Sequence, residues 1–453
     1  IQEIIDIYKN WKSTGAARAT LLQELSTIPG VYVPSLYEPI YNEDGTISGI
    51  TKQHASAPIP VVKRIVSELP PAPMRFIVPY IDIVHNRVPI EIMRGCTRGC
   101  RFCHAGMVNR PVRERSVEEI LQTIDAALQF TGFEEIGLLS LSSSDYTHIT
   151  ELVKAVGSHY AGKHLAISLP SLRIDTFSVE LMDALRDSRR GGFTLAPEAA
   201  TEHMREIINK PVSTEQLLET TRQIYSRGWT TIKLYFMIGH PSETIEDVQA
   251  IADLCKLVLS EGRKVIGRRA KLNAGISTFV PKPHTPFQWV PCDSVEQIRA
   301  KQTLLKQELR NPDIKLTWTT PEDTLLEAWL SRGDRRMAEV IFRAWQAGAK
   351  FDAWQEHFQY ELWLEAFSEA GLDPAFYTHR PRSQDEIFPW DHINPGVRKK
   401  FLVEDYQMSL SSQTRPDCRL HCYACGILPT FAKQRRAHPG PAWQCPEVKS
   451  PQP

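Results

Sequence analysis

The sequence of 453 residues lacks an excess of charge of either sign, because 53 Lys and Arg residues balance 53 Asp and Glu residues. A formal net charge of zero gives no overall field that would draw the chain to nucleic acid or to a membrane surface. Uninterrupted apolar runs of about 18 residues are absent, so the sequence predicts no membrane-spanning helix. No signal peptide is visible, and we expect a cytoplasmic protein.

Cysteine is scarce, and nine residues in a chain of this length do not make a disulfide scaffold. Six of the nine nevertheless fall in two tight clusters, which are Cys96, Cys100 and Cys103 in the first and Cys418, Cys422 and Cys425 in the second. In a chain without an export signal, such clustering indicates metal ligation in a reducing cytosol.

The first cluster has the spacing C-x3-C-x2-C and follows an extended apolar run at residues 88–93. Gly95 and Gly99 permit the tight turns that bring three thiolates of one loop together. A cubane [4Fe–4S] cluster usually takes four cysteines, so three ligands leave one iron free for another group. The alternatives are half of a zinc site, or cysteines buried as small hydrophobic side chains.

Strand and helix patterns alternate from Phe76 to about Val290. The expected strands are residues 88–93, 135–141, 165–169, 192–196, 231–238 and 275–280. The expected helices between them are residues 116–130, 148–160, 178–186, from 213 onward, and 243–259. This order predicts a parallel α/β sheet or barrel, in which the chemistry lies at the C-terminal ends of the strands.

The rest of the chain divides into three segments. Residues 1–75 carry two short helical patterns, an Asp44-Gly45 turn signal and a proline-rich connector, with too little apolar material for a core of their own. Residues 296–410 are mostly helical in pattern and rich in Trp, and residues 411–453 form a Cys-rich tail. We therefore expect boundaries near 75, 295 and 410, with the α/β unit at 76–295.

The cysteine loop resembles the cluster motif of the radical SAM superfamily, including an aromatic residue, Phe102, just before the last cysteine. The resemblance implies a partial, TIM-barrel-like (β/α)6 fold and a [4Fe–4S] cluster on Cys96, Cys100 and Cys103. It also implies that the open iron binds S-adenosylmethionine (SAM), which is cleaved reductively to a 5′-deoxyadenosyl radical. An electron donor such as flavodoxin or ferredoxin would supply the electron.

Three further motifs match the superfamily in the right order. Members of the superfamily carry a Gly-Gly-Glu-like segment after the second strand, whereas this chain has serines there. Ser142 and Ser143 either hydrogen-bond SAM or begin a helix. Glu198 and Lys210 match the residues that meet the ribose or amine and the carboxylate of SAM. Gly239 and Pro241 lie in a Gly-x-Pro-x-Glu-Thr match, whose backbone would support the adenine.

The proline-rich segment 279–289 and the segment 109–116 resemble a branch with an N-terminal cobalamin-binding-type domain, which is related to methylthiotransferases. The resemblance implies methyl or methylthio transfer, and it makes residues 1–75 the tail of a Rossmann-like domain together with a linker. The cobalamin motif D-x-H-x-x-G is absent, so cobalamin is not supported by this chain.

The second cluster, Cys418, Cys422 and Cys425, repeats the spacing of the first. It indicates either an auxiliary iron–sulfur cluster or a structural zinc site with Cys445 or His421 as fourth ligand. Six arginines surround the first cluster and either meet RNA phosphates or pair with neighbouring acids: Arg94, Arg98, Arg101, Arg110, Arg113 and Arg115. The substrate class stays open between small molecule, RNA and protein. The alternative function is a non-catalytic iron–sulfur or zinc scaffold that binds RNA.

Overall fold

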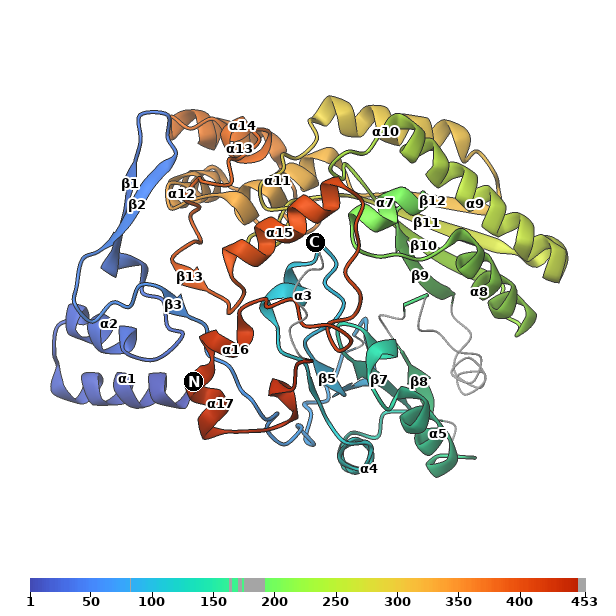
Figure 1. Ribbon diagram of the computed structural model, residues 1–453, viewed down its shortest axis with the longest axis horizontal. Helices are drawn as coiled ribbons and strands as arrows, with labels where there is room; N and C mark the ends of the chain where they lie inside the picture. Colours follow the sequence, from blue (N-terminus) through green and yellow to red (C-terminus); the bar gives the residue numbers. More distant parts are fainter. Residues whose placement is uncertain (82, 163–164, 170–172, 175–191, 447–453) are drawn as a thin grey trace.

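Two parallel sheets form the centre of the molecule in the computed structural model, which describes residues 1–81, 83–162, 165–169, 173–174 and 192–446 (Figure 1). Within these ranges, one sheet has the strand order β4-β7-β8 and the other has the order β12-β11-β10-β9. Neighbouring strands run parallel throughout both sheets, which confirms the expected α/β class. The strand bounds are β4 (Val88–Glu91), β7 (Glu135–Leu139), β8 (Ala166–Ser168), β9 (Phe193–Glu198), β10 (Thr231–Ile238), β11 (Lys271–Thr278) and β12 (Ile314–Trp318).

Helices pack on one face of these sheets and bury it. They are α4 (Val117–Thr131), α5 (Ile149–His159), α8 (Thr214–Ser226), α9 (Ile245–Ile266) and α10 (Val295–Glu308). The short helices α3 (His104–Val108) and α7 (Glu202–Ile207) belong to separate apolar clusters. Alternate residues of β10, such as Ile232, Leu234 and Phe236, share one core with Val248 and Ile251 of α9. Each of these buried apolar side chains contributes roughly 1.5–3 kcal/mol to the stability of the fold. The larger sheet is therefore a stable support for the loops at its end.

The expected helix starts are confirmed in position, with one difference in detail. Ser213 and Thr244 begin α8 and α9 with complete capping boxes. Ser116 begins α4 by accepting a hydrogen bond from the backbone N–H of Glu119. The Glu119 carboxylate does not complete that box, because it pairs instead with the buried guanidinium of Arg115.

The structure differs from one sequence expectation, and it does not test another. Residues 314–318 lie in the segment expected to be mostly helical, yet they form β12 at the edge of the larger sheet. The run Ile314-Lys-Leu-Thr-Trp318 alternates apolar and polar side chains, which suits a strand that is covered on one face. The expected helix at 178–186 lies outside the described residues.

The N-terminal segment lies against the C-terminal half of the chain. It contains α1 (Gln2–Thr14), α2 (Arg18–Ser26), and the hairpin of β1 (Tyr37–Tyr41) and β2 (Ile47–Lys52), whose turn holds Asp44-Gly45 as expected. Strand β3 (Val61–Val62) pairs with β13 (Ile393–Asn394). This pairing joins the proline-rich connector to a segment more than 300 residues away.

Short helices and loops of the C-terminal half return across the α/β unit (Figure 1). They are α11 (Pro321–Arg332), α12 (Met337–Ala347), α13 (Tyr360–Glu369), α14 (Pro374–Thr378), α15 (Lys399–Leu410), α16 (Ile427–Thr430) and α17 (Ala432–Ala437). Figure 1 shows the red tail with α16 crossing close to α3, which follows the cysteine loop. No helix in the described ranges is both long and apolar enough to cross a membrane.

Candidate metal and SAM site

The cysteine loop is closed at its base by a short antiparallel pair. Strand β5 (Met93–Arg94) pairs with β6 (Arg113–Glu114), so the whole loop leaves and returns at one place. Gly95 begins the loop with a φ of 95°, and a Cβ there would lie 2.7 Å from the carbonyl oxygen of Pro111. Only glycine fits such a conformation and such a close approach without strain.

The three thiols of the loop face one another. Burial, followed by the nearby thiols of Cys100 and Cys103, raises the pKa of Cys96 to about 12. Each sulfur also receives a donor: the backbone N–H of Arg98 for Cys96, the guanidinium of Arg173 at 3.7 Å for Cys100, and the backbone N–H of Gly106 at 3.3 Å for Cys103. Such donors are what thiolates bound to an iron–sulfur cluster require.

The donor set of the loop is three cysteine sulfurs, the ligand type that iron–sulfur clusters take. The cysteines of a cubane bind different irons and so stand further apart than the ligands of one ion. The residues present therefore fit the [4Fe–4S] group that their spacing predicted.

Glu198 and Lys210 meet beside this loop, although one ends β9 and the other follows α7. Lys210 Nζ donates to Glu198 Oε1 at 3.0 Å, and both charges act on the thiol of Cys103. Glu198 has a φ of 67°, which is uncommon for a residue with a side chain and marks a position held by its surroundings. The structure therefore places this predicted pair beside the cysteine loop as an ion pair.

The serines after β7 turn into their own segment. The Ser142 hydroxyl donates to Asp145 at 2.6 Å, and the Ser143 hydroxyl donates to the Leu138 carbonyl at 3.2 Å, within a 3-10 turn (Ser143–Asp145). Asp145 in turn pairs with Arg98 of the cysteine loop, and its charge acts on Cys96. The acid at this strand end is therefore Asp145, which stands later in the chain than the position where the superfamily motif has its acid.

Hydrogen bonds to Glu243, a residue of the turn itself, hold the turn after β10 in place. Glu243 Oε1 accepts the backbone N–H of Gly239 at 2.8 Å and the ammonium of Lys301 at 2.7 Å. Gly239 has a φ of 87°, and a Cβ there would lie 2.9 Å from the Asp293 carboxylate. Pro241 is half-buried in the same turn. The motif is thus a packed corner whose backbone is held in place.

Phe102 is the aromatic residue of the motif, and it packs beneath this corner. Its ring lies 6.2 Å from the ring of the buried His240 and belongs to a cluster with Phe279 and Phe287. The cysteine loop and the turn after β10 are therefore in contact through aromatic side chains.

The arginines of the loop are engaged inside the protein. Arg101 is fully buried and bonds Asp405 at 3.2 Å. The other partners are Glu91 for Arg94, Asp145 for Arg98, the Gly106 carbonyl for Arg110, the Val66 and Asn109 carbonyls for Arg113, and Glu91 and Glu119 for Arg115. Of the two readings of this patch, the structure supports pairing with neighbouring acids and backbone carbonyls rather than an RNA-binding face.

The second cysteine cluster lies against the first loop. Cys96 lines a cavity of about 560 Å³ together with Cys418, Cys422, Cys425 and Cys445. The backbone N–H of Cys418 donates to the Thr97 carbonyl at 3.1 Å. His421, the other candidate for a fourth ligand, is not among the residues that line this cavity.

Asn209 and Asp417 are further residues that motif spacing did not indicate. Asn209 donates to the carbonyls of Arg98 and Gly99 at 3.2 and 3.1 Å and accepts from the backbone N–H of Arg415 at 2.7 Å. Asp417 accepts from the Thr97 hydroxyl at 2.7 Å. Both hold the loop through contacts distant in sequence. The one sequence signal for Asn209 was its residue type, because asparagine adopts a positive φ more readily than most residues and stands directly before Lys210.

Several known proteins are similar to part of this chain. An uncharacterized protein of Methanocaldococcus jannaschii is 30% identical over 252 residues, covering 56% of this chain and 53% of that protein. A tRNA-2-methylthio-N(6)-dimethylallyladenosine synthase of Desulforamulus reducens is 25% identical over 179 residues, covering 37% and 39%. A ribosomal protein uS12 methylthiotransferase of Aliarcobacter butzleri is 21% identical over 171 residues, covering 36% and 38%. The chain thus spans about half the length of these curated relatives or less.

Among solved structures, the radical S-adenosylmethionine methyltransferase TsrM from Kitasatospora setae, with cobalamin and a [4Fe-4S] cluster bound, has a TM-score of 0.37. It is 16% identical, and the match covers 45% of this chain and 38% of that one. The family model of the radical SAM superfamily matches residues 90–255, which hold the cysteine loop, the Glu198–Lys210 pair and the turn after β10. Residues 90–255 are therefore similar to a radical SAM domain, and they are called the SAM domain below.

Proposed function

We propose that this chain is a radical SAM enzyme that holds a [4Fe–4S] cluster on Cys96, Cys100 and Cys103. The observation that carries the proposal is the convergence of the three thiols beside the Glu198–Lys210 pair, at the ends of the parallel strands. When bound, the reduced cluster supplies one electron to SAM, which breaks a C–S bond and yields methionine and a 5′-deoxyadenosyl radical.

The residues of the chain bind and orient SAM. Lys210 offers a cation for the carboxylate of SAM, and Glu198 offers an anion for its ammonium group or ribose hydroxyls. Bound SAM would therefore replace the ion pair that these two side chains form with each other. The backbone at Gly239 and Pro241 supports the adenine, and Phe102 packs behind the loop. Ser142 acts through Asp145, which fixes Arg98 beside Cys96, whereas Ser143 holds the same turn by its bond to the Leu138 carbonyl.

The reaction class follows from the named relatives, several of which are methylthiotransferases. We infer methyl or methylthio transfer to a substrate outside this chain, with the electron supplied by a cytoplasmic donor such as flavodoxin or ferredoxin. The arginines of the cysteine loop bond acids and carbonyls of the chain itself, which argues against their use in recognising that substrate.

The test is release of 5′-deoxyadenosine after anaerobic reconstitution, chemical reduction and addition of SAM. Wild-type protein is expected to release it, and Cys103→Ala is expected to release none. Cys255→Ala is the matched control, because Cys255 is buried in α9 within the apolar core and should leave the activity intact. Wild-type protein that releases no more than Cys103→Ala while holding iron would instead be the non-catalytic scaffold.

A further inference from the structure

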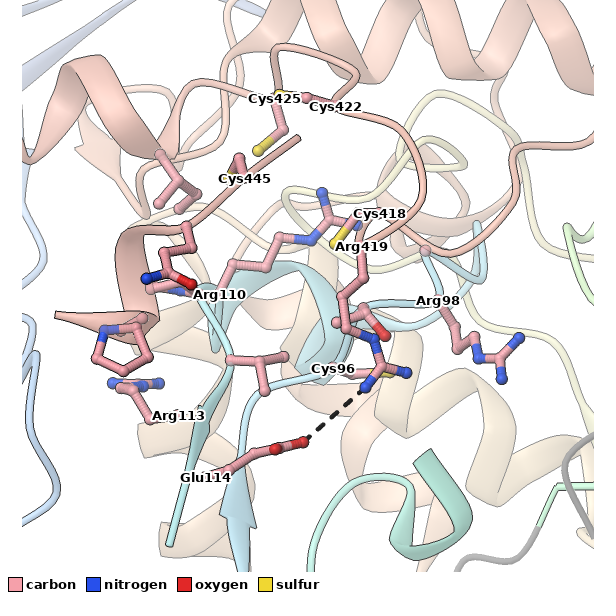
Figure 2. A pocket seen from close by; sticks show the side chains of 18 of the residues that line it. Cys96, Arg98, Arg110, Arg113, Glu114, Cys418, Arg419, Cys422, Cys425 and Cys445 are labelled. Carbon is pink, nitrogen blue, oxygen red and sulfur yellow. Dashed lines mark ion pairs between the residues drawn. The ribbon is translucent and has the colours of Figure 1, made fainter. Parts of the chain in front are cut away.

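Four cysteines of the C-terminal tail gather around one place, although one of them is distant in sequence from the rest. Cys418, Cys422 and Cys425 are half-buried, and Cys445 is exposed at the rim. Burial, followed by the nearby thiols of Cys422, Cys425 and Cys418, raises the pKa of Cys445 to about 11, and all four line the same cavity. Figure 2 shows Cys422, Cys425 and Cys445 on one side of the space and Cys418 on the other. The tail therefore presents a complete set of four sulfur ligands.

The backbone on both sides of this set is anchored. Gly426 has a φ of 112°, and a Cβ there would lie 2.5 Å from Arg398 Cγ, so the chain turns tightly directly after Cys425. The Cys425 carbonyl accepts the backbone N–H of Arg398 at 2.9 Å. Trp443, just before Cys445, is buried in a cluster with Phe431. The cysteines are thus carried by packed segments and not by a loose end.

A buried cation lies among these sulfurs. Arg110 is only 6% exposed, and it lines the same cavity as Cys96, Cys418 and Cys425 (Figure 2). Its Nε donates to the Gly106 carbonyl at 3.3 Å. Within the described ranges no carboxylate pairs with Arg110. A buried guanidinium without a carboxylate needs another negative partner, because burying a charge alone costs several kcal/mol. Four thiolates that hold a cluster supply that charge.

We propose that Cys418, Cys422, Cys425 and Cys445 bind a second [4Fe–4S] cluster, with one cysteine on each iron and with Arg110 beside it. All four irons then have protein ligands, so this cluster does not bind SAM. The four sulfurs line one cavity of about 560 Å³, which is larger than a single ion needs. The same cavity reaches Cys96, so the second cluster forms a wall of the space next to the first.

The tail is fixed on the first loop by direct bonds, which sets the place of this wall. The Thr97 hydroxyl bonds Asp417, and the Thr97 carbonyl accepts from the backbone N–H of Cys418. Arg419 donates to the Asp145 carbonyl at 2.9 Å and lies 3.9 Å from Glu114 (Figure 2). Metal binding by the tail therefore orders the surface that faces the SAM domain.

Iron and sulfide counts after anaerobic reconstitution test the proposal. Two cubanes predict about eight irons per chain, and Cys418→Ser/Cys422→Ser/Cys425→Ser predicts about four. The complementary variant Cys96→Ala/Cys100→Ala/Cys103→Ala is expected to keep about four irons and a reduced-cluster electron paramagnetic resonance signal, even though it cannot cleave SAM. Failure of the second cluster is thus distinguishable from failure of the first.

Two single variants identify the fourth ligand. Cys445→Ser is expected to lose iron from the second cluster and to change its resonance spectrum, whereas Cys292→Ser, at a buried cysteine outside the cavity, is expected to change neither. An unchanged iron content in the triple-serine tail variant would overturn the proposal. One zinc per chain that is lost only in that variant would also overturn it, in favour of a zinc site.

The place of Arg110 is tested by the reduction potential of the second cluster, measured in the variant that lacks the first. A cation beside a cluster favours the reduced, more negative form. Arg110→Gln is therefore expected to lower the potential, and Arg110→Lys is expected to keep most of it. An unchanged potential in Arg110→Gln would place the cluster away from this residue.

Discussion

His240 is a buried imidazole in the corner that the SAM domain builds after β10. It is 4% exposed, and neither of its ring nitrogens has a hydrogen-bond partner in the described structure. Burial, followed by the nearby ammonium of Lys301, lowers its pKa to about 3. The side chain is therefore neutral in the folded protein at neutral and mildly acidic pH, and its ring packs between Phe102 and Phe279.

This depressed pKa predicts a loss of stability in mild acid. Between the folded pKa of about 3 and the unfolded value near 6.5, only the unfolded chain takes up the proton, so stability falls as the pH falls. From pH 7 to pH 5 the contribution of His240 is about 2 kcal/mol. Urea unfolding at pH 5, 6 and 7 is expected to show a smaller decline for His240→Gln than for wild type.

The decline should not vanish in that variant, because burial also lowers the pKa of His284, to about 4. His148→Gln is the matched control, since His148 is exposed in a pair with Glu151. Equal pH dependence of His240→Gln and wild type would contradict the prediction.

At the scale of elements, the cysteine loop is defined by the β5–β6 pair that closes it. Met93 stands opposite Glu114, and Arg94 stands opposite Arg113. Gly95 follows at once, where the carbonyls of Asn109 and Pro111 leave no space for a side chain. The ends of the loop are thus held together before any metal binds.

Gly95→Ala is expected to destabilise the protein by about 2–3 kcal/mol and to reduce the iron that the first loop retains, since it adds both a strained φ and a steric overlap. Gly132→Ala shares the positive φ, at 69°, but has nothing within 4 Å of the added Cβ, so it isolates the backbone cost of about 1 kcal/mol. Thermal unfolding and iron content of both variants provide the measurement. A cost for Gly95→Ala no greater than that for Gly132→Ala would show that the closure of the loop is not needed.

At the scale of the whole molecule, Arg101 joins three distant segments. It donates to the carbonyls of Glu206 and Ile207 at the end of α7, to Asp405 of α15, and to the Gln413 carbonyl before the tail. Asp405 also pairs with Arg415 at 3.3 Å. The residue next to a predicted cluster ligand thus connects the SAM domain to the C-terminal region.

Arg101→Met is expected to lower the free energy of unfolding by about 3 kcal/mol, because it leaves buried acceptors without donors. The companion change is Arg94→Met, whose partner Glu91 is partly exposed and also bonded to Arg115, and its cost is expected to stay under about 1 kcal/mol. Denaturant unfolding of both variants checks the difference. Protease sensitivity of residues 411–446 should rise in Arg101→Met alone, and equal behaviour of the two variants would refute the connecting role.

The sequence by itself determined the local features of this protein. The spacing of Cys96, Cys100 and Cys103, the glycines beside them and the alternation of strands and helices are short-range patterns, and each follows from backbone geometry within one element. The resemblance of its motifs to the superfamily also indicated that Glu198 and Lys210 belong near the cysteine loop. It did not reveal β12, whose alternating pattern lies among helical ones.

The tertiary structure alone decided which distant groups meet. The pairs Arg98–Asp145, Arg101–Asp405 and Thr97–Asp417 join residues that no periodicity relates. The same holds for Cys445, which reaches Cys422 only because Trp443 is buried against Phe431. A charged or sulfur side chain can find its partner anywhere along the chain, so the choice depends on the packing of whole elements and not on sequence spacing.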